Sequence, residues 1–443
     1  MYHPRVKTKG LLIALFCVFG LVANAQTGST SNPLNQRENN PYSKYGIGEL
    51  WNANTAELQG MGSITSAYAD GNTLNADNPA SYAFLQRTVI EGGAIASTRT
   101  VDGSGLSYKT GTLSIAYLNI GVPVGKNGGL SFGLRPYSRS YFSLVDTAIN
   151  TSIGSIERSY GGQGSLNYAY IGGAAKYKGL SVGFNFGYLF GTFQQTTALV
   201  PIDTNAINRA YISNFTNYVR IGGIYWKGGA MYETRFHDST YALRLGATVT
   251  LSQNLTERLN AYQISVYNFG DTIVNDTSYN PGEQRGKLKM PMSYCLGAML
   301  AKSDLWSVGI DYSATQWNTF NSSPESSMNI AVGNQSNRLS IGGEINPLPV
   351  KAHKHYSRLS YRLGMYYGTD YLQINGTALP VYGVTFGGSL HFKPTHFSWV
   401  NLHTAFDIGR IGTTQNNLIQ QTYVRWLLGI SFNDRWFIPR KYD

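Results

Sequence analysis

Large apolar residues alternate with small or polar residues along most of this chain. In residues 180–190 every second position is Leu, Val, Phe or Tyr, and the positions between are mainly Ser, Gly and Asn. The same alternation recurs in residues 241–251, 382–392 and 423–432. Because successive side chains of a β-strand point to opposite faces, each run predicts a strand with one apolar face and one small or polar face.

Counting such runs from Arg87 onward predicts about fourteen strands, an even number as expected for a single-chain membrane barrel. The expected fold class is therefore all-β, a transmembrane antiparallel β-barrel of about 14 strands preceded by a compact N-terminal segment. The expected strands cover residues 87–101, 109–124, 129–146, 157–176, 180–200, 208–235, 240–268, 285–302, 305–320, 336–348, 356–373, 379–393, 397–412 and 420–432.

The expected connections alternate between short and long. Those at residues 125–128 and 177–179 are tight turns, whereas those at 269–284 and 321–335 are long. Barrels of the bacterial outer membrane place short turns in the periplasm and long loops outside. An even number of strands returns the chain to its starting side, so we expect both termini in the periplasm of a Gram-negative cell.

A large soluble β-sandwich would show the same alternation, so strand length and composition must separate the two. Most expected strands exceed a dozen residues, whereas soluble strands average about 5–6. Charged residues make up 13% of the chain, against ~25% in soluble domains, and the chain has 50 Gly, 32 Tyr and 19 Phe. This composition excludes a disordered chain, and after the first two dozen residues no run of about 18 apolar residues predicts a membrane helix. The barrel is favoured.

The first 25 residues have the pattern of an export signal. Arg5, Lys7 and Lys9 precede an apolar run at 11–22, and Ala-Asn-Ala at 23–25 is a cleavage site. About 12 apolar residues are too few for a membrane anchor. Losing these three cations lowers the formal charge from +11 to +8, which could attract anionic lipid headgroups or lipopolysaccharide or be scattered surface charge.

Three short motifs precede the strands: Gly60-Met61-Gly62, Ala69-Asp70 and Asn78-Pro79-Ala80. Asn78 can cap a short helix, and Pro79 suits the first turn of that helix. The order and spacing of these motifs, including Gly60, Gly62, Asp70 and the tripeptide that ends in Ala80, resemble the hatch of the FadL-type outer-membrane transport family. In that family the hatch plugs a fourteen-stranded barrel.

The resemblance implies passage of hydrophobic small molecules, typically long-chain fatty acids or aromatic hydrocarbons, through the barrel and sideways through its wall. About twenty hatch residues carry it, and no loop or lumen motif matches, so the substrate does not carry over. The expected division of the chain is a signal peptide at 1–25, a leader and periplasmic hatch or plug at 26–86, the transmembrane barrel at 87–432 and a periplasmic tail at 433–443.

Pro136 interrupts the third expected strand. Proline has no N–H to give to a β-ladder, so it is confined to edges, bulges or breaks. In the family an opening near the third strand is the lateral exit, and the resemblance implies that Pro136 marks a lateral gate. A bulge, or a strand end beyond the membrane, is the other interpretation.

Arg135 and Arg139 flank Pro136 on the expected lumen face. An Arg that faced lipid at the midplane would cost about 2–4 kcal/mol. Most lumen charges are expected to pair with one another and with hatch residues. The functional interpretation is that Arg135 and Arg139 hold an acidic ligand headgroup through bidentate hydrogen bonds.

The leading hypothesis for function is an outer-membrane channel for passive uptake of fatty-acid-like molecules, gated by the hatch. The alternative is a scaffold or shuttle subunit of an outer-membrane secretion machine, with an outer-membrane or periplasmic protein partner. No nucleophile constellation or phosphate-binding motif predicts an enzyme or a cofactor. His353 and His355 lack a nearby carboxylate, so we expect no metal site. Net charge alone gives no support for nucleic-acid binding.

Overall fold

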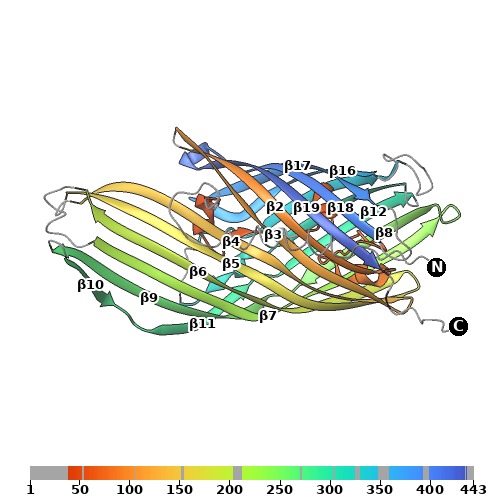
Figure 1. The fold of residues 1–443 in the computed structure, drawn as a ribbon, viewed down its shortest axis with the longest axis horizontal. Coiled ribbons are helices and arrows are strands. Elements are labelled where there is room, and N and C mark those ends of the chain that lie inside the picture. The colour runs from red at the N-terminus through yellow and green to blue at the C-terminus, as the bar shows by residue number, and fades with distance from the viewer. Residues whose placement is uncertain are drawn as a thin grey trace, which may run out of the picture.

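The computed structural model shows one antiparallel sheet that closes on itself as a barrel (Figure 1). No helix of the described part of the chain is long and apolar enough to cross a membrane. The expected signal peptide, most of the leader and most of the tail lie outside the described residues. The structure describes residues 38–51, 54–103, 105–150, 154–202, 212–269, 272–302, 305–324, 330–347, 359–392, 399–434 and 436.

Fourteen strands form the wall, as predicted, and two of them are interrupted. The wall strands are β2 (Thr88–Gly103), β3 (Leu106–Val124), β4 (Gly128–Asn150), β5 (Gly154–Tyr177), β6 (Leu180–Pro201), β7 (Ile212–Phe236), β8 (Tyr241–Thr250) with β9 (Gln253–Phe269), β11 (Glu283–Met290) with β12 (Ser293–Lys302), β13 (Trp306–Thr315), β15 (Ser336–Ile345), β16 (Leu359–Ile374), β17 (Thr377–His391), β18 (Trp399–Gly412) and β19 (Gln420–Asp434). The other strands are β1 (Glu49–Leu50) on β4, β10 (Thr272–Tyr279) on β9 and β14 (Asn321–Ser322) on β11.

The last wall strand closes the barrel against the first. β19 pairs with β2 from Gln420 opposite Asp102 to Asp434 opposite Thr88. Closure removes the unpaired backbone groups that a free sheet edge would expose, which a wall in lipid requires.

Two of the expected strands are broken in the structure. Residues 240–268 form β8 and β9, separated by Leu251 and Ser252, and residues 285–302 form β11 and β12. The second break contains Pro291, which has no N–H for the ladder.

Two expected boundaries are also wrong. The expected loop at 269–284 contains β10, which forms a hairpin with β9. The expected strand at 305–320 ends at Thr315, and the chain turns into the 3-10 helix η5 (Trp317–Thr319). A second 3-10 helix, η8 (Gln415–Asn417), joins β18 to β19.

The apolar face of the wall strands points outward. On β6, Phe184, Phe186 and Tyr188 are 45%, 49% and 51% exposed, whereas Asn185 between them is fully buried. This is the arrangement that the alternation in the sequence predicts for a strand between lipid and a filled interior.

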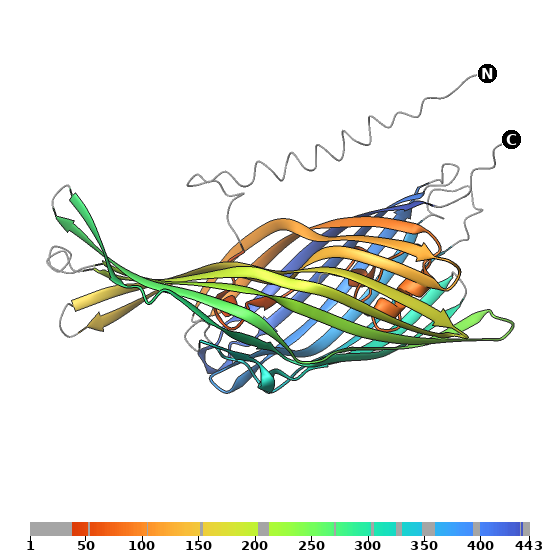
Figure 2. The ribbon, with the colours of Figure 1, turned by 90° about the horizontal axis from the view of Figure 1, so that it is seen from below.

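The strands extend farther at one end of the barrel than at the other (Figure 2). At one end, which we call the short-turn end, the connections at residues 125–127, 178–179 and 237–240 are tight turns. At the other, the long-loop end, β4 to β7 are 22–25 residues long and extend with β9 and β10 beyond the other strands. The predicted asymmetry of the connections is present only in part, because the connections from β2 to β3, β4 to β5 and β16 to β17 at the long-loop end are also short.

The residues before β2 lie against the inside of the wall (Figure 2). Residues 38–51 contain the 3-10 helix η3 (Pro41–Lys44) and β1. We call them the gap segment, because they lie at a gap between β3 and β4 that is described below. The interior segment, residues 54–86, contains α2 (Ala56–Gly60) and the 3-10 helix η4 (Pro79–Phe84). α2 contacts β16 to β19, and η4 contacts β3 to β7. The interior segment thus occupies the short-turn half of the barrel.

A cluster of buried apolar side chains extends from the interior segment, where it includes Leu74 and Tyr82, toward the long-loop end. It includes Tyr168, Phe193, Trp317 and Tyr371, and Ile47 of the gap segment packs into it. Apolar packing therefore joins the interior segment, the gap segment and the wall.

Candidate functional site

β3 and β4 separate part-way along the wall. Their backbone pairing runs from Val124 opposite Gly128 to Leu118 opposite Leu134, and it ends there. β3 nevertheless extends back to Leu106 and β4 onward to its end at position 150, each still paired with its other neighbour. The wall therefore has a gap in its backbone ladder, open toward the long-loop end.

Pro136 lies at the start of this gap, two positions after the last β3–β4 pair. It opposes Asn167 of β5, and a register shift between Pro136 and Ser138 leaves Tyr137 as an extra residue, a β-bulge. The structure thus contains both a bulge and the end of a ladder at Pro136. A role as a gate stays a prediction.

The bulge reverses the faces of β4. Beyond it, Ser138 and Phe142 are 0% and 2% exposed, and Arg139 falls on the other side of the strand, opposite Ser165. The sequence predicted Arg139 beside Arg135 on the lumen face, and this prediction is wrong. Simple alternation cannot anticipate a bulge, because the extra residue changes the parity of everything after it.

Arg139 bridges the gap. Its guanidinium donates to Ser114 Oγ and, at 2.9 Å, to the carbonyl oxygen of Ile115, both on β3. The guanidinium carbon also lies 4.4 Å from the centre of the Trp51 ring, a cation–π contact. Side chains from β4 and the gap segment thus join two strands that no longer share a ladder.

The gap segment supplies backbone partners to β4. In β1, Glu49 opposes Arg139 and Leu50 opposes Ser138. The Trp51 N–H then donates to the Tyr137 carbonyl oxygen at 2.9 Å. β1 is therefore a short substitute for the missing stretch of β3.

Asn39 and Asn40 fill the gap farther toward the long-loop end. The Asn39 N–H donates to Thr110 Oγ1 of β3 at 3.1 Å, and its side-chain amide donates to the Ser143 carbonyl oxygen of β4 at 3.0 Å. The Asn40 N–H donates to the Tyr141 carbonyl oxygen at 2.9 Å. Asn39 thus touches both separated strands at once.

Glu49 ties the gap segment to the barrel interior. Its carboxylate accepts from Arg99 at 2.6 Å, from Arg425 at 2.5 Å and from the side-chain amide of Asn40 at 2.9 Å. Burial alone would raise the pKa of Glu49, but the two guanidinium groups lower that pKa to about 2. Glu49 is therefore ionised at neutral pH.

Asn78, Pro79 and Ala80 form the helix start that the sequence predicted. The Asn78 side chain accepts from the Ala80 N–H at 3.0 Å, and Pro79 occupies the first turn of η4. The Asn78 amide also donates to the Ser66 carbonyl oxygen at 2.5 Å. One side chain therefore caps η4 and fixes it to the preceding loop.

Gly60, Gly62 and Asp70 lie in the same segment. The Thr385 hydroxyl donates to the Gly60 carbonyl oxygen at 3.1 Å and accepts from the Gly62 N–H at 2.7 Å, which fixes the end of α2 on β17. Gly62 has φ +70°, a region that glycine adopts readily. Asp70 accepts from the Asn72 N–H at 2.7 Å, and burial raises its pKa.

Asp77 receives two cations from the wall. Its carboxylate lies 3.0 Å from Arg135 Nη2 and 3.1 Å from Lys227 Nζ. Burial would raise the pKa of Asp77, but the Arg135 guanidinium and the Lys227 ammonium outweigh burial and hold that pKa below its usual range. The charge of Arg135 thus serves to hold the interior segment.

Lumen-facing glycines let the interior segment touch the wall directly. A Cβ added at Gly183, Gly229 or Gly246 would overlap atoms of the interior segment. The atoms met are those of Pro79, Asn78 and Ser66, respectively. Part of the high glycine content therefore serves close contact between this segment and the barrel, which period-two alternation does not reveal.

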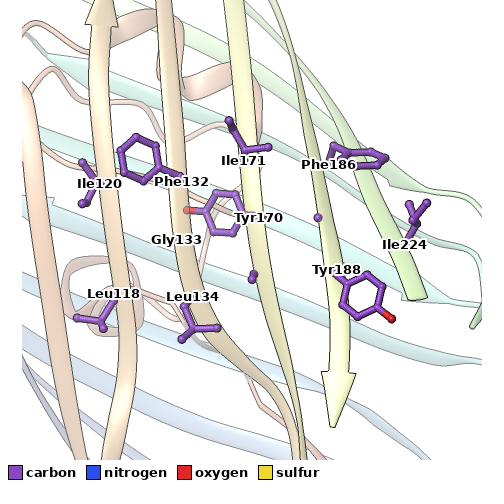
Figure 3. Close-up of a pocket in the computed structure, with 12 residues that line it drawn as sticks. Leu118, Ile120, Phe132, Gly133, Leu134, Tyr170, Ile171, Phe186, Tyr188 and Ile224 are labelled. Atoms are coloured by element: carbon purple, nitrogen blue, oxygen red, sulfur yellow. The ribbon is translucent and has the colours of Figure 1, made fainter. Parts of the chain in front are cut away.

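An apolar groove of about 550 Å³ lies on the lipid-facing side of the wall (Figure 3). It begins at Leu118 and Leu134, the last residues of the β3–β4 ladder, and crosses β5 and β6 to Ile224 of β7. Its outward side chains are large except Ala169, which opposes Leu134 on β4 and Tyr188 on β6. A small residue between large ones leaves the hollow.

The described side chains do not form a metal site. Within that part of the chain, no group of three or more His, Cys, Asp or Glu is placed to hold a metal ion. His353 and His355 lie outside the described residues.

Three parts of this site have no signal in the sequence. The gap segment has no periodicity, Lys227 is an ordinary cation in a long strand, and the side of Arg139 depends on the bulge. At the gap itself, Pro136 carried a local signal, because proline marks a place where a ladder is interrupted.

The fold is a closed, fourteen-stranded antiparallel β-barrel that matches the barrels of FadL-type outer-membrane proteins. The chain belongs to the BamG family, whose model matches residues 7–443. Similar solved structures are the Pseudomonas putida toluene transporter TodX (18% identity, 87% of this chain and 99% of that chain, TM-score 0.57), the Ralstonia pickettii toluene transporter TbuX (14%, 86% and 98%, 0.57) and the CymD monoaromatic hydrocarbon channel (16%, 87% and 99%, 0.54). At these identities the likeness concerns the fold. Comparison with curated proteins gives no significant match.

Proposed function

We propose that this protein is a passive outer-membrane channel for hydrophobic small molecules, which leave through the wall between β3 and β4. One observation carries the proposal: the ladder between these strands stops at Leu118 and Leu134, although both strands continue. Backbone groups in a lipid-embedded wall need partners. The gap segment supplies partners here, so its withdrawal opens the wall without breaking any β3–β4 ladder bond.

Apolar surfaces meet this gap on both sides. Inside, Tyr42 and Ile47 of the gap segment belong to the buried apolar cluster. Outside, Leu118 and Leu134 line the start of the groove. Apolar burial is worth about 25 cal/mol per Å². A hydrophobic molecule that moves from the buried apolar cluster to the outer groove therefore remains stabilised by contact with apolar side chains.

In this proposal the interior segment is the hatch. It fills the short-turn half of the barrel and is held there by the Asp77 ion pairs and by close contacts at lumen glycines. Because the interior segment blocks the path along the barrel axis, a hydrophobic molecule leaves through the gap between β3 and β4.

Toluene is the first compound to test, because similar folds are described as toluene transporters. A fatty acid is the second. Arg139 contacts neutral acceptors at the gap and is placed to orient a carboxylate there. Arg135 would first have to leave Asp77.

A disulfide that fixes the gap segment tests the route. Leu50 and Ser138 are directly opposite, within the usual Cα separation for a disulfide, so we would introduce Leu50→Cys and Ser138→Cys together with Cys295→Ser. Under oxidation, uptake of labelled toluene and oleate by cells should fall to that of cells without the barrel. A reductant should restore it.

The matched control places the same cross-link in a continuous ladder. Met365 and Val384 are opposite on β16 and β17, and both face outward, so the Met365→Cys/Val384→Cys variant should transport equally in both redox states. Wild-type uptake by the oxidised gap variant would refute the lateral route. If wild-type protein carries neither compound and copurifies with a stoichiometric protein, the scaffold role replaces the channel.

A further inference from the structure

Three arginines lie side by side across neighbouring strands. Arg220 of β7 is directly opposite Arg258 of β9, and Arg258 is directly opposite Arg285 of β11. Directly opposite like charges destabilise a sheet, with Cβ atoms about 4.5–5.5 Å apart. We call these residues the arginine row.

The arginine row faces away from the barrel interior. On β9 the alternate residues Leu255, Glu257 and Leu259 are 0–1% exposed, so Arg258 between them points outward. The Arg258 and Arg285 side chains are 46% and 71% exposed. Arg220 is exposed as well.

Positive charge around the row exceeds the nearby negative charge. Glu283 lies 3.1 Å from Arg285 Nε and 3.7 Å from Arg258 Nη1. Lys287 and Lys289 follow on the same face of β11, opposite Thr256 and Asn254. Five cations therefore share this surface with one carboxylate, which suits a ligand with more than one negative charge.

The cations begin where the apolar band of the wall ends. On the same faces, toward the short-turn end, Leu251 and Leu296 are 46% and 52% exposed. By register, Lys289 lies three positions beyond the level of Leu251, Lys287 five, and the arginine row seven. At about 3.3 Å per residue, the cations lie roughly 10–23 Å along the strands beyond the level of Leu251.

We propose that this surface binds the phosphate groups of a phosphorylated glycolipid of the outer leaflet, of the lipopolysaccharide type. Its acyl chains lie on the apolar band near Leu251 and Leu296, and its phosphates meet Lys289, Lys287 and the arginine row. Guanidinium groups bind phosphate bidentately, and a phosphate between neighbouring arginines relieves their repulsion. This site is separate from the β3–β4 gap and does not depend on transport.

Native mass spectrometry and thermal unfolding with added lipid A test the proposal. The variant is Arg220→Gln/Arg258→Gln, which leaves the Glu283–Arg285 pair in place. We expect lipid A to bind wild-type protein and to raise its Tm, and the variant to bind at least tenfold more weakly. Without lipid, the variant should be as stable as wild type or more so, because two facing charges are gone.

The control Lys126→Gln/Lys178→Gln removes two exposed charges at the short turns and should bind lipid A like wild type. Dephosphorylated lipid A should bind wild-type protein no better than lipid A binds the arginine variant. Equal lipid A binding by wild type and the arginine variant would overturn the proposal. So would equal binding of the dephosphorylated lipid, or full competition by millimolar inorganic phosphate.

Discussion

At the scale of single residues, Pro136 coincides with two changes in the wall. It stands where the β3–β4 ladder ends and where a bulge turns β4 over. That reversal moves Arg139 from the expected lumen face into the gap, while Arg135 stays with Asp77. Two arginines four positions apart therefore have different roles.

Replacing Pro136 with Val should reduce transport. Val supplies the N–H that proline lacks, and one additional ladder hydrogen bond contributes about 1 kcal/mol, so uptake should fall roughly fivefold. Toluene uptake and a heat-modifiable band on gels measure transport and folding. Uptake equal to wild type in a folded variant would show that Pro136 is not part of a gate.

Gly229→Ala should loosen the interior segment. The new methyl group would overlap Asn78 Oδ1 and Pro79, whereas a Cβ at neighbouring Gly228 would lie 3.8 Å from Val249. Overpacking of this kind costs about 1–3 kcal/mol. Hydrogen exchange of residues 72–84 should accelerate in Gly229→Ala and stay at the wild-type rate in Gly228→Ala. Equal rates would mean that the wall does not fix this segment.

At the scale of elements, alternation predicted the wall well because each strand carries its own period-two signal. It missed the breaks at Leu251 and Pro291, since interruptions depend on neighbouring strands as well as on local sequence. The cap at Asn78 was predictable because capping is local. The contacts of Asn39 with β3 and β4 were not predictable, because the local sequence does not indicate which distant residues it will contact.

Asp77→Asn tests how η4 and its loop are held. The variant leaves Arg135 and Lys227 facing a neutral amide, and a hydrogen bond to a charged group contributes about 1.5–3 kcal/mol. Residues 72–80 should become sensitive to added protease while the barrel stays folded. Acid should mimic the variant: the pKa of Asp77 is lowered in the folded protein, so its stabilisation is present above the unfolded pKa of about 3.9 and is lost as pH falls through the lower folded value. Protease resistance like that of wild type would show that other contacts suffice.

At the scale of the whole molecule, the N-terminal residues both fill the barrel and complete its wall. The interior segment fills the short-turn half, and the gap segment completes the wall beside β4 and contributes Tyr42 and Ile47 to the buried apolar cluster. Wall and filling come from one chain.

Deleting residues 39–50 should leave a folded but leaky barrel. The gap would lose its backbone partners and the Glu49 anchor, while the β2–β19 closure remains. We expect frequent ion-conductance events in planar bilayers, where wild type is nearly silent, and a heat-modifiable band for both. Silent bilayers with the folded deletion variant would mean that the gap segment does not seal the wall.

The contact between Gln59 and Asp407 has a consequence for how the protein assembles. The two residues are 348 positions apart, and Asn40 meets Gln421 over 381 positions. Loop-closure entropy must be overcome before such distant contacts stabilise anything, which makes chains of high contact order slow to fold. The N-terminal residues can therefore make these contacts only after the last strands are in place. We therefore expect these interior contacts and the β2–β19 closure to form late in folding.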